Sequence, residues 1–504
     1  MCIRDRDKDI LQSSQLEVTI EMNEEHLDVL IVGAGISGIG AGYYLKNKCS
    51  NKSFKILESR KQLGGTWDLF KYPGIRSDSD MTTMGFRFKP WTGKNLVAGG
   101  GAILDYLNDV VDENGFREKI QYNSHVTHAS WKSNESKWHV TYRNKNDESE
   151  SLITCNFLYF CVGYYDYEKG HEPIFNGQDN FKGTIIHPQH WPENLDYKEK
   201  NVVVIGSGAT AVTLIPSMAD ETKHITMLQR SPTYYMVRPN IDPIGAFFRR
   251  FMGKTVSYFV MRWKNIQLQS WFFKRARKDP KLIKEFLIGV VKEKLNPDYD
   301  VNKHFTPTYN PWEQRLCLVP DGDLFTAIND GKASVVTDQV ESFTSDGIKL
   351  RSGQELPADI IVTATGLQLM VCGNIEISVD DEIIDISKTM TFKGMMVSDV
   401  PNVVWTFGYT NASWTLRADL TAEYTCKIIN YMDKNGYSIA TPSPSSEVGE
   451  EGSWLDFNSG YVTRSTHLFP RQGNRDPWKN TQNYTKDVFS LRYGKVRDDE
   501  LEFS

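Results

Sequence analysis

The chain has 504 residues, of which 40% are hydrophobic and 24% charged, enough for about two to four domains with cores of their own. The net charge of -6 gives no support for a nucleic-acid partner, so we expect a small-molecule or protein partner. The seven cysteines are scattered without a C-x-x-C pair, which predicts reduced, buried thiols in a cytoplasmic protein.

The N-terminal segment, residues 1–26, is mostly polar and charged and lacks the pattern of a signal peptide. We expect it to be a leader outside the fold, either disordered or artefactual. Two stretches further along, residues 29–45 and 202–219, are free of charge for long enough to resemble membrane spans. Each is a short β-branched run followed by a glycine-rich turn, which is typical of a strand and a helix rather than of a span.

The first of these stretches predicts a nucleotide site. A strand at residues 28–32 leads directly into a G-x-G-x-x-G turn and a helix, whose N-terminal N–H groups would face a pyrophosphate. The glycines of this turn are Gly33, Gly35 and Gly38. The next strand, residues 54–57, ends in Glu58, which can accept hydrogen bonds from ribose hydroxyls and disfavours a 2'-phosphate. This turn therefore favours FAD.

The second stretch repeats the pattern of strand, glycine-rich turn and helix, and predicts a second nucleotide site. Its strand, residues 202–205, leads into a turn and a helix start formed by Gly206, Ser207, Gly208, Ala209, Thr210 and Ala211. The strand that follows, residues 224–229, ends in Arg230 and Ser231, a cation and a hydroxyl that suit a 2'-phosphate. The site favours NADPH, although a lone arginine such as Arg230 is also a common solvated surface residue.

The long separation of the two turns predicts an α/β fold with two doubly wound, Rossmann-like dinucleotide-binding domains, the second inserted into the first. We expect residues 359–366 to be the strand that returns the chain to the first domain. The predicted division is listed in chain order: 27–160 for the first part of the FAD-binding domain, 161–366 for the NADPH-binding domain, and 367–504 for the second part of the FAD-binding domain with a C-terminal tail.

A helical insertion is predicted at about residues 240–307, within the second domain. From Arg249 to Lys294 it contains 13 Lys or Arg residues against three Asp or Glu residues. Two interpretations fit these basic helices: a solvated face above a substrate cavity, which we favour, and peripheral association with the inner, anionic face of a membrane.

The sequence lacks the residue patterns that disulfide and metal chemistry require. Cys155 and Cys161 lie in a predicted strand and are expected in the core rather than as a redox pair. The stretch FKGTIIHPQHWP, residues 181–192, precedes the second nucleotide-binding strand and is predicted to be a hinge. Its histidines, His187 and His190, lack further ligands at metal-binding spacing, so no metal site is expected. The chemistry that the sequence still allows is that of a flavin, NADPH and oxygen.

Two stretches carry a resemblance to a known family. GGTWDLFKYPGIRSD, residues 64–78, resembles the longer fingerprint of the Baeyer–Villiger monooxygenases, and residues 181–192 resemble their shorter one. Trp191 favours this family over the related flavin N- and S-oxygenases, which usually have another aromatic residue there. The resemblance extends from about residue 27 to residue 497.

This resemblance implies an FAD- and NADPH-dependent monooxygenase that uses O2 to insert one oxygen atom next to the carbonyl of a small apolar ketone. The product would be an ester or lactone, and sulfides or thioamides would be further substrates. Two enzymatic alternatives stay open: an N- or S-oxygenating flavin monooxygenase, and an uncoupled NADPH oxidase or flavin reductase. A non-catalytic membrane-associated binder is a third alternative.

The resemblance also assigns roles to residues. The essential arginine of the family falls on Arg315, which would hydrogen-bond a peroxide and the oxyanion formed on the ketone, with Asp78 orienting its guanidinium. The residues implied as flavin contacts are Ser37, Thr66, Trp67, Asp68, Leu69, Asp78 and Val126. His187 is implied to be a hydrogen-bonding strut. Gln314 stands where many members have a lysine, so NADPH preference is expected to depend mainly on Arg230.

Overall fold

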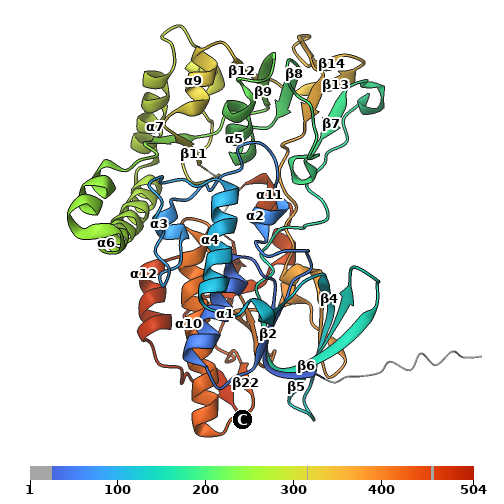
Figure 1. Cartoon of the computed structure of the whole chain (residues 1–504), viewed down its shortest axis with the longest axis vertical. Coiled ribbons are helices and arrows are strands. Elements are labelled where there is room, and N and C mark those ends of the chain that lie inside the picture. The colour runs from blue at the N-terminus through green and yellow to red at the C-terminus, as the bar shows by residue number, and fades with distance from the viewer. Residues whose placement is uncertain (1–24, 315, 456–458) are drawn as a thin grey trace, which may run out of the picture.

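A computed structural model describes residues 25–314, 316–455 and 459–504 of the chain (Figure 1). The predicted leader falls outside the described residues except at its end, where Glu25 and His26 are already part of strand β1 (Glu25–Val32). The leader expectation is therefore wrong for these two residues. They pair with β6 (Glu150–Phe160), opposite Ile153 and Thr154.

The first sheet contains segments from both ends of the chain. Its order is β18-β17-β4-β5-β6-β1-β2-β3, and β21 also pairs with β6. The strands β3, β2, β1, β6 and β21 run parallel to one another, whereas β4 and β5 form an antiparallel extension. The bounds not yet given are β2 (Phe54–Leu57), β3 (Ile120–Gln121), β4 (Ser124–Lys132), β5 (Lys137–Asn144), β17 (Glu376–Val379), β18 (Glu382–Ile383) and β21 (Val403–Trp405).

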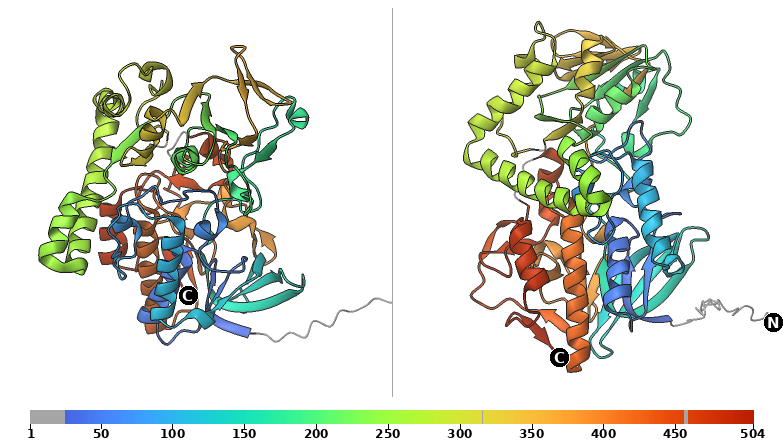
Figure 2. Two further views of the ribbon diagram at one scale, coloured as in Figure 1. Left: turned by 45° about the horizontal axis from the view of Figure 1, so that its top comes forward. Right: turned by 60° about the vertical axis from the view of Figure 1, so that its left-hand side comes forward.

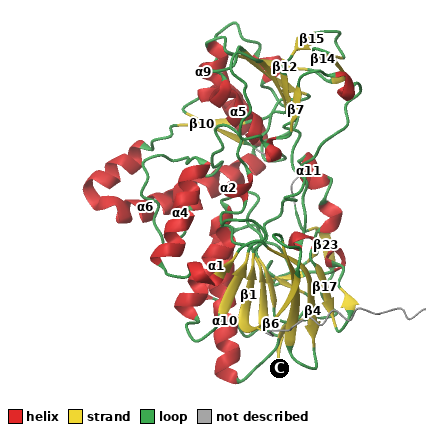
Figure 3. Cartoon of the chain, turned by 45° about the vertical axis from the view of Figure 1, so that its right-hand side comes forward, coloured by secondary structure: helices red, strands yellow, loops and turns green. Residues whose placement is uncertain are grey.

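Strand β1 is an almost continuous apolar run because both of its faces are buried. Val29 and Ile31 join a cluster with the helices, and Leu30 and Val32 point to the opposite cluster. The helical layer contains α1 (Ile36–Lys48), α4 (Gly100–Glu113) and α10 (Trp414–Asn435) (Figures 1 and 3). On the other face, strands β4 and β5 fold over the parallel strands together with aromatic residues from the C-terminal part of the chain.

The second sheet is fully parallel, with the order β12-β9-β8-β16-β7. Helices α5 (Ala209–Met218) and α9 (Asp323–Asn329) pack on one face. A small antiparallel sheet of β13 (Val340–Thr344), β14 (Gly347–Leu350) and β15 (Glu355–Pro357) covers the other. The parallel strands are β7 (Thr184–Ile186), β8 (Asn201–Ile205), β9 (His224–Gln229), β12 (Ala333–Thr337) and β16 (Ile360–Val362).

The second sheet lies within the chain segment between β6 and β21, so the predicted class, two Rossmann-like units with the second inserted into the first, is confirmed. One detail differs. Strand β16, expected to return the chain to the first domain, pairs with β8 and β7 in the middle of the second sheet. The chain leaves this sheet only after Val362, because the apolar run Ile360–Val362 is buried between two parallel neighbours.

The predicted helical insertion is confirmed and consists mainly of α6 (Pro243–Lys278) and α7 (Pro280–Lys294), followed by α8 (Val301–His304). Asp242 caps α6, accepting hydrogen bonds from the N–H groups of Ile244 and Gly245. A non-helical residue, Gly253, with φ 73° and ψ 173°, kinks α6. The two helices project from one side of the molecule (Figure 2).

Helix α6 is anchored to the first domain by polar contacts that are fully buried. The Arg262 guanidinium donates to the carbonyl oxygens of Thr82 (2.8 Å) and Gly85 (2.6 Å) and lies 3.4 Å from the Asp419 carboxylate. Asn265 donates to Asp80 at 3.0 Å. Such a network stabilises one docking position, because a lost partner would leave a buried charge uncompensated.

The loop between α2 (Thr66–Leu69) and α3 (Met81–Met84) makes a second contact between the domains, in which the first domain reaches into the second. Phe70 and Tyr72 belong to the apolar core of the second domain. Gly74 has φ 74°, and a Cβ atom there would lie 1.8 Å from Ser217 Oγ on α5. Arg76 forms an ion pair of 2.5 Å with Asp323 at the start of α9.

Replacing Arg262 with alanine tests the anchor. Burial raises the pKa of Asp419 to about 6, and the Arg262 charge opposes that rise. Arg262→Ala leaves the buried carboxylate without its cation, so we expect a loss of about 3 to 5 kcal/mol in the free energy of unfolding, measured by denaturant titration.

This loss should depend on pH. A carboxyl group with a raised folded-state pKa contributes stability that is fully present below its ordinary pKa and lost as the pH rises through the folded-state value. Arg262→Ala raises the pKa of Asp419 further, so the variant should be more destabilised at about pH 8 than at about pH 5. The exposed Arg250→Ala is the control on the same helix and should change stability by less than about 0.5 kcal/mol. Equal effects of both variants would contradict the anchor.

Candidate cofactor and active site

Both glycine turns open into one cavity of about 1710 Å³ between the two domains. This volume exceeds the roughly 300 to 1,000 Å³ of a site for one small ligand. Most of the residues predicted as nucleotide contacts line it, as follows: Gly33, Gly35, Ser37, Glu58, Thr66, Trp67, Leu69, Asp78, Val126, Gly206, Ser207, Gly208, Ala209, Thr210, Arg230 and Ser231. Gly38, Asp68 and Ala211 do not.

The first turn is tight for reasons of backbone packing. Gly33 has φ 101°, and a Cβ atom there would lie 2.7 Å from the Cys161 carbonyl oxygen. A Cβ atom on Gly38 would lie 1.8 Å from the Gly33 carbonyl oxygen, which explains why this glycine packs within the turn rather than lining the cavity. Helix α1 therefore begins directly at the cavity, and none of the described side chains caps its first turn. Its N–H groups are left for a ligand.

Glu58 ends strand β2 with its carboxylate buried beside this turn. It accepts hydrogen bonds from the N–H groups of Ala34 (2.7 Å) and Arg60 (2.9 Å). Burial raises the pKa of Glu58, while these two N–H groups oppose the rise. The carboxylate lines the cavity and keeps further lone pairs that can accept ribose hydroxyls.

The second turn differs from the first in what surrounds its glycines. Gly206 has φ 142°, and a Cβ atom there would lie 2.3 Å from the Ala364 carbonyl oxygen. For Gly208, which caps α5, no described atom lies within 4 Å of where a Cβ atom would be. The fold itself therefore has room for a side chain at Gly208, and the absence of one leaves space for a ligand to approach the N-terminus of α5.

The predicted phosphate-binding residues lie at the far end of this turn. Arg230 and Ser231 are exposed at the cavity edge, directly after β9. The Ser207 hydroxyl lies 2.8 Å from that of Thr233 and orders the segment between turn and edge. Gln314 also lines the cavity.

The longer fingerprint contributes Thr66, Trp67 and Leu69 to the cavity wall. Asp68, predicted as a flavin contact, turns away, because Arg60, Gln62 and Lys71 donate hydrogen bonds to its carboxylate. These donors hold the pKa of Asp68 below its ordinary value against the effect of burial. The Asp68 side chain thus connects α2 to residues before and after this helix and does not line the cavity.

Of the two residues predicted to act in catalysis, the structure describes Asp78 but not Arg315. Asp78 is exposed and lines the cavity. Burial raises the pKa of Tyr72 to about 12, and the charge of Asp78 adds to that rise. Arg315 lies outside the described residues, so its pairing with Asp78 stays a prediction. Its neighbours Gln314 and Cys317 line the cavity.

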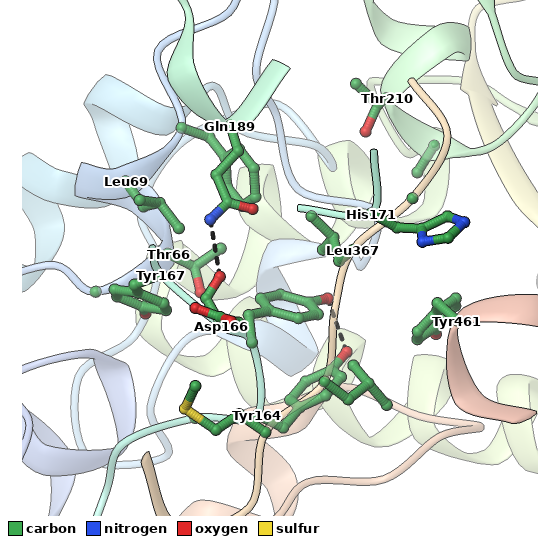
Figure 4. Close-up of a pocket in the computed structure, with 18 of the residues that line it drawn as sticks. Thr66, Leu69, Tyr164, Asp166, Tyr167, His171, Gln189, Thr210, Leu367 and Tyr461 are labelled. Atoms are coloured by element: carbon green, nitrogen blue, oxygen red, sulfur yellow. Dashed lines mark hydrogen bonds between the residues drawn. The ribbon is translucent and has the colours of Figure 1, made fainter. Parts of the chain in front are cut away.

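The cavity contains buried polar atoms whose partners are missing from the described residues. They are Gln189 Oε1, Ser413 Oγ, Thr415 Oγ1 and Ser459 Oγ. Buried polar groups in folded proteins are nearly always hydrogen-bonded, so these oxygens fit a site that holds a polar ligand such as a dinucleotide. The Gln189 side chain is fixed by its amide, which donates to the Asp166 carbonyl oxygen at 2.7 Å (Figure 4).

Helix α10 is a third helix whose N-terminus faces the cavity, since Ala412, Ser413 and Thr415 line it. Trp414, on the same turn, donates its indole N–H to Ser37 Oγ at 2.8 Å and stacks on Tyr164 with ring centroids 5.0 Å apart. The predicted flavin contact Ser37 thereby connects α1 to α10. The 22 residues of α10 direct the positive end of a long helix dipole at the cavity.

The predicted hinge contains His187 as a buried hydrogen-bonding residue. Its Nε2–H donates to the Gly366 carbonyl oxygen at 3.2 Å, and its Nδ1 accepts from the Gln189 N–H at 3.3 Å. The first bond joins the segment after β7, inside the second domain, to the connection that leaves this domain after β16, so His187 is a hydrogen-bonding residue as predicted. Burial lowers the pKa of His187, which favours the neutral ring that both contacts require.

Metal ligands and the cysteines Cys155 and Cys161 were considered in the sequence as sources of other chemistry. No cluster of three or more His, Cys, Asp or Glu side chains able to hold a metal occurs in residues 25–314, 316–455 and 459–504. Cys155 and Cys161 are buried, as predicted, and burial raises the pKa of both thiols well above the ordinary value.

Sequence reasoning missed the buried oxygens of Gln189, Ser413, Thr415 and Ser459. A local signal existed for two of them: the stretch NASWT precedes a helix and offers hydroxyl groups at its N-terminus. For Gln189 and Ser459 no local signal marks the side chain, because only the folding of remote segments brings them to the cavity.

The fold and the cavity define a protein with two dinucleotide sites that meet at a domain boundary, the arrangement of oxidoreductases that pair two nucleotide cofactors. The model of the flavin-binding monooxygenase-like family matches residues 95–371, and that of an NAD(P)-binding Rossmann-like domain matches residues 31–91. The chain belongs to the flavin-binding monooxygenase-like family, which confirms the predicted membership among flavin-dependent monooxygenases.

Curated relatives match nearly the whole chain. The FAD-containing monooxygenase EthA of Mycobacterium tuberculosis is 50% identical over 482 residues, covering 95% of this chain and 98% of the relative. The probable FAD-binding monooxygenase AlmA of Acinetobacter baylyi is 47% identical over 482 residues, covering 95% and 96%.

Solved structures share the fold at low identity. A steroid monooxygenase bound to NADP has a TM-score of 0.75 and 19% identity, with 95% of this chain and 99% of that chain covered. A cyclohexanone monooxygenase has a TM-score of 0.73 and 21% identity, with 95% and 100% covered.

Gly208→Ala tests the second nucleotide site. The backbone at Gly208, φ -79° and ψ -174°, suits alanine, and a Cβ atom meets no described atom, so folding and the first site should be unaffected. The methyl group would occupy the approach of a pyrophosphate. We expect the NADPH dissociation constant to rise roughly tenfold or more, equal to ~1.4 kcal/mol, in a titration followed by calorimetry.

Gly289→Ala is the matched control, since it also adds a methyl group in open space, on helix α7 away from the cavity. Unchanged NADPH affinity in Gly208→Ala, with the control also unchanged, would contradict a nucleotide at this turn.

Proposed function

We propose that this monooxygenase binds FAD at the first turn and NADPH at the second and uses them, with O2, to oxygenate a small apolar ketone to an ester or lactone. The observation that carries the proposal is the opening of both glycine turns into one cavity. Bound FAD would supply the redox centre that accepts hydride from NADPH and activates O2. A steroid monooxygenase and a cyclohexanone monooxygenase with this fold support the ketone class.

The chain positions the two cofactors through backbone groups. The N–H groups at the starts of α1 and α5, which no described side chain caps, would bind the pyrophosphates, and Glu58, which lines the cavity, would accept hydrogen bonds from the FAD ribose. Arg230 and Ser231 distinguish NADPH from NADH by contacting the 2'-phosphate.

In this proposal, oxygenation takes place at the end of the cavity between α10 and α2, the helix within the longer fingerprint. The N-terminus of α10 would favour negative charge on a group bound at this end, because its dipole is directed at the cavity. Trp414, Tyr164 and Phe407 form an aromatic cluster that lines this end of the cavity, with Trp414 stacked on Tyr164 and Phe407 tilted against both. We assign Arg315 to the oxyanion that forms on the ketone, with Asp78 orienting its planar guanidinium.

The N/S-oxygenating and uncoupled-oxidase alternatives use the same two nucleotide sites and differ only in the fate of the activated oxygen. Product analysis therefore separates them: an ester from a ketone, a sulfoxide from a sulfide, or hydrogen peroxide whichever substrate is added. The relationship to EthA and AlmA supports an oxygenase over an oxidase. We place the enzyme in the cytoplasm.

Arg230→Ala tests the NADPH assignment. The variant loses one charge-assisted contact to a phosphate, worth ~1.5 to 3 kcal/mol. The Michaelis constant for NADPH should rise well over tenfold while that for NADH changes little, as measured by initial rates of cofactor oxidation. The exposed Lys223→Ala, on the same domain but away from the cavity, is the control. Unaltered discrimination between the two coenzymes would remove Arg230 from this role.

Arg315→Ala and Arg315→Lys test the oxygenation step. Alanine should keep FAD bound, because neither the Gly33 turn nor Glu58 contacts this residue's side chain in the proposal, yet abolish ester formation. Lysine keeps the charge but loses the planar fork and should fail as well. Ester yield, hydrogen peroxide release and bound FAD are measured together; conversion of ketone at near the parental rate by either variant rejects the assignment.

A further inference from the structure

Exposed apolar side chains are concentrated on the helical insertion. Eighteen large hydrophobic residues are exposed in the described chain, and twelve of them lie between Ile241 and Phe286. Among these twelve, the most exposed are Phe251 (68%), Trp263 (67%), Phe247 (59%) and Trp271 (59%). Single exposed apolar residues are normal, but a cluster of aromatic side chains on one element indicates a surface with a partner.

These residues form a stripe on each segment of α6. Before the kink, Ile244, Phe247 and Phe251 are spaced by three and four residues. After Gly253 the chain turns back, since Lys264 pairs with Asp242 and the Ser257 hydroxyl donates to the Gly245 carbonyl oxygen. The second segment therefore lies beside the first and carries a stripe of its own, Val256, Phe259, Trp263 and Trp271. Residues at this spacing share one side of a helix. The buried residues Tyr258, Arg262, Asn265 and Ala276 lie on the opposite side, against the protein, so the stripe faces away from it.

The shape of the molecule keeps the stripe accessible. Helices α6 and α7 project beyond the two sheets at one side of the molecule in both views (Figures 1 and 2). Leu282 and Phe286, four residues apart on α7, add exposed apolar surface to the same projection.

The positive charge of this region indicates the chemistry of the partner. Residues 249–294 carry 13 basic against three acidic residues, a surplus of ten, whereas the whole chain has net charge -6, so the remainder carries -16. Lys274 and Lys278 are exposed three and seven residues after Trp271, at the end of the same stripe, and Lys254 is exposed at the kink. Aromatic residues flanked by lysines are typical of helices that lie at the interface of an anionic bilayer.

A second copy of the chain fits this surface poorly. In a two-fold dimer the same patch would face itself, and the surplus of positive charge would then be placed against its own equivalent. The helices do not cross the bilayer either, since none of the described helices is long and apolar enough for a span.

We propose that the exposed stripe of α6, together with its lysines, is a docking surface for an anionic lipid bilayer. The Phe and Trp side chains enter the boundary between headgroups and acyl chains, and Lys254, Lys274 and Lys278 contact lipid phosphates. The acidic remainder of the molecule orients this face toward the membrane and the rest away from it.

Docking at this place would bring the cavity close to the lipid. On the inner side of α6, Phe273 packs against Trp312 with ring centroids 5.5 Å apart, and Phe272 and Ala276 belong to one apolar cluster with Tyr309. Tyr309 lines the cavity. If the proposed oxygenation of an apolar substrate holds, a substrate dissolved in the bilayer is presented to the wall on which the docking helix rests.

The test measures vesicle binding of the FAD-loaded enzyme without turnover, so its result does not depend on the proposed reaction. Vesicles of phosphatidylcholine alone are compared with vesicles that also contain phosphatidylglycerol, by co-sedimentation at low and high salt. Phe251→Ser/Trp263→Ser removes apolar contacts, and Lys274→Glu/Lys278→Glu reverses charge. Bound FAD and the rate of NADPH oxidation in vesicle-free buffer check that each variant is folded.

Matched controls carry the same changes elsewhere on the surface. Ile383→Ser/Phe489→Ser removes two side chains that are 68% and 65% exposed, and Lys182→Glu/Lys223→Glu reverses two exposed lysines. We expect binding to anionic vesicles that weakens with salt, a partition constant roughly tenfold or more lower in each α6 variant, and parental binding in both controls.

Quenching of tryptophan fluorescence by brominated lipids gives a second measurement. Trp263→Phe/Trp271→Phe keeps the apolar surface, so it should bind like the parent but lose much of the quenching. Failure of the parent to bind anionic vesicles, parental binding by the α6 variants, or unchanged quenching would each overturn the proposal. A parental dimer that Phe251→Ser/Trp263→Ser converts to a monomer, without vesicle binding, would instead assign the stripe to a second copy of the chain.

Discussion

Gly74 approaches helix α5 so closely that a Cβ atom would lie 1.8 Å from the Ser217 oxygen. This approach fixes the loop of one domain on the helix that starts the nucleotide site of the other. Tyr72, two residues earlier, is packed in the second core; burial raises the pKa of its phenol, and Thr210 in the first turn of α5 opposes the rise. The spacing between the two nucleotide turns therefore depends on the contact of Gly74 with Ser217, and neither of these two residues lines the cavity.

The nucleotide turns could be predicted because their constraints are local. Gly33 and Gly206 adopt positive φ and approach a neighbouring strand connection, so the residue type itself marks the geometry. Asp68 shows the limit of this reasoning. Matching the fingerprint placed it beside the flavin, but the direction of its side chain is decided by Arg60 and Gln62, which surround it from behind. A motif locates a backbone more securely than it locates each side chain.

The basic helices were predicted correctly as an element, but the charge count did not show which of their side chains are exposed. Counting charges treats all basic residues alike, whereas the fold uses several of them internally. Arg262 pairs with buried Asp419, Lys264 with Asp242, and Arg249 donates to two backbone carbonyl oxygens. The apolar pattern was ambiguous for a physical reason as well: α6 carries apolar residues on both its buried and its exposed side, so periodicity alone does not show which side faces the core.

The second domain is held at the hinge as well as at α5 and α6. Its two connections to the first domain run side by side, since the His171 N–H donates to the Gly366 carbonyl oxygen at 3.0 Å. His187, directly after β7 of the second sheet, donates to the same oxygen at 3.2 Å. Rotation of the second domain about this hinge would have to shift both the Gly74 contact and the Arg262 anchor. Loop, helix and hinge thus restrain one motion from three sides, and the cavity between the two nucleotide turns keeps its width as long as all three contacts hold.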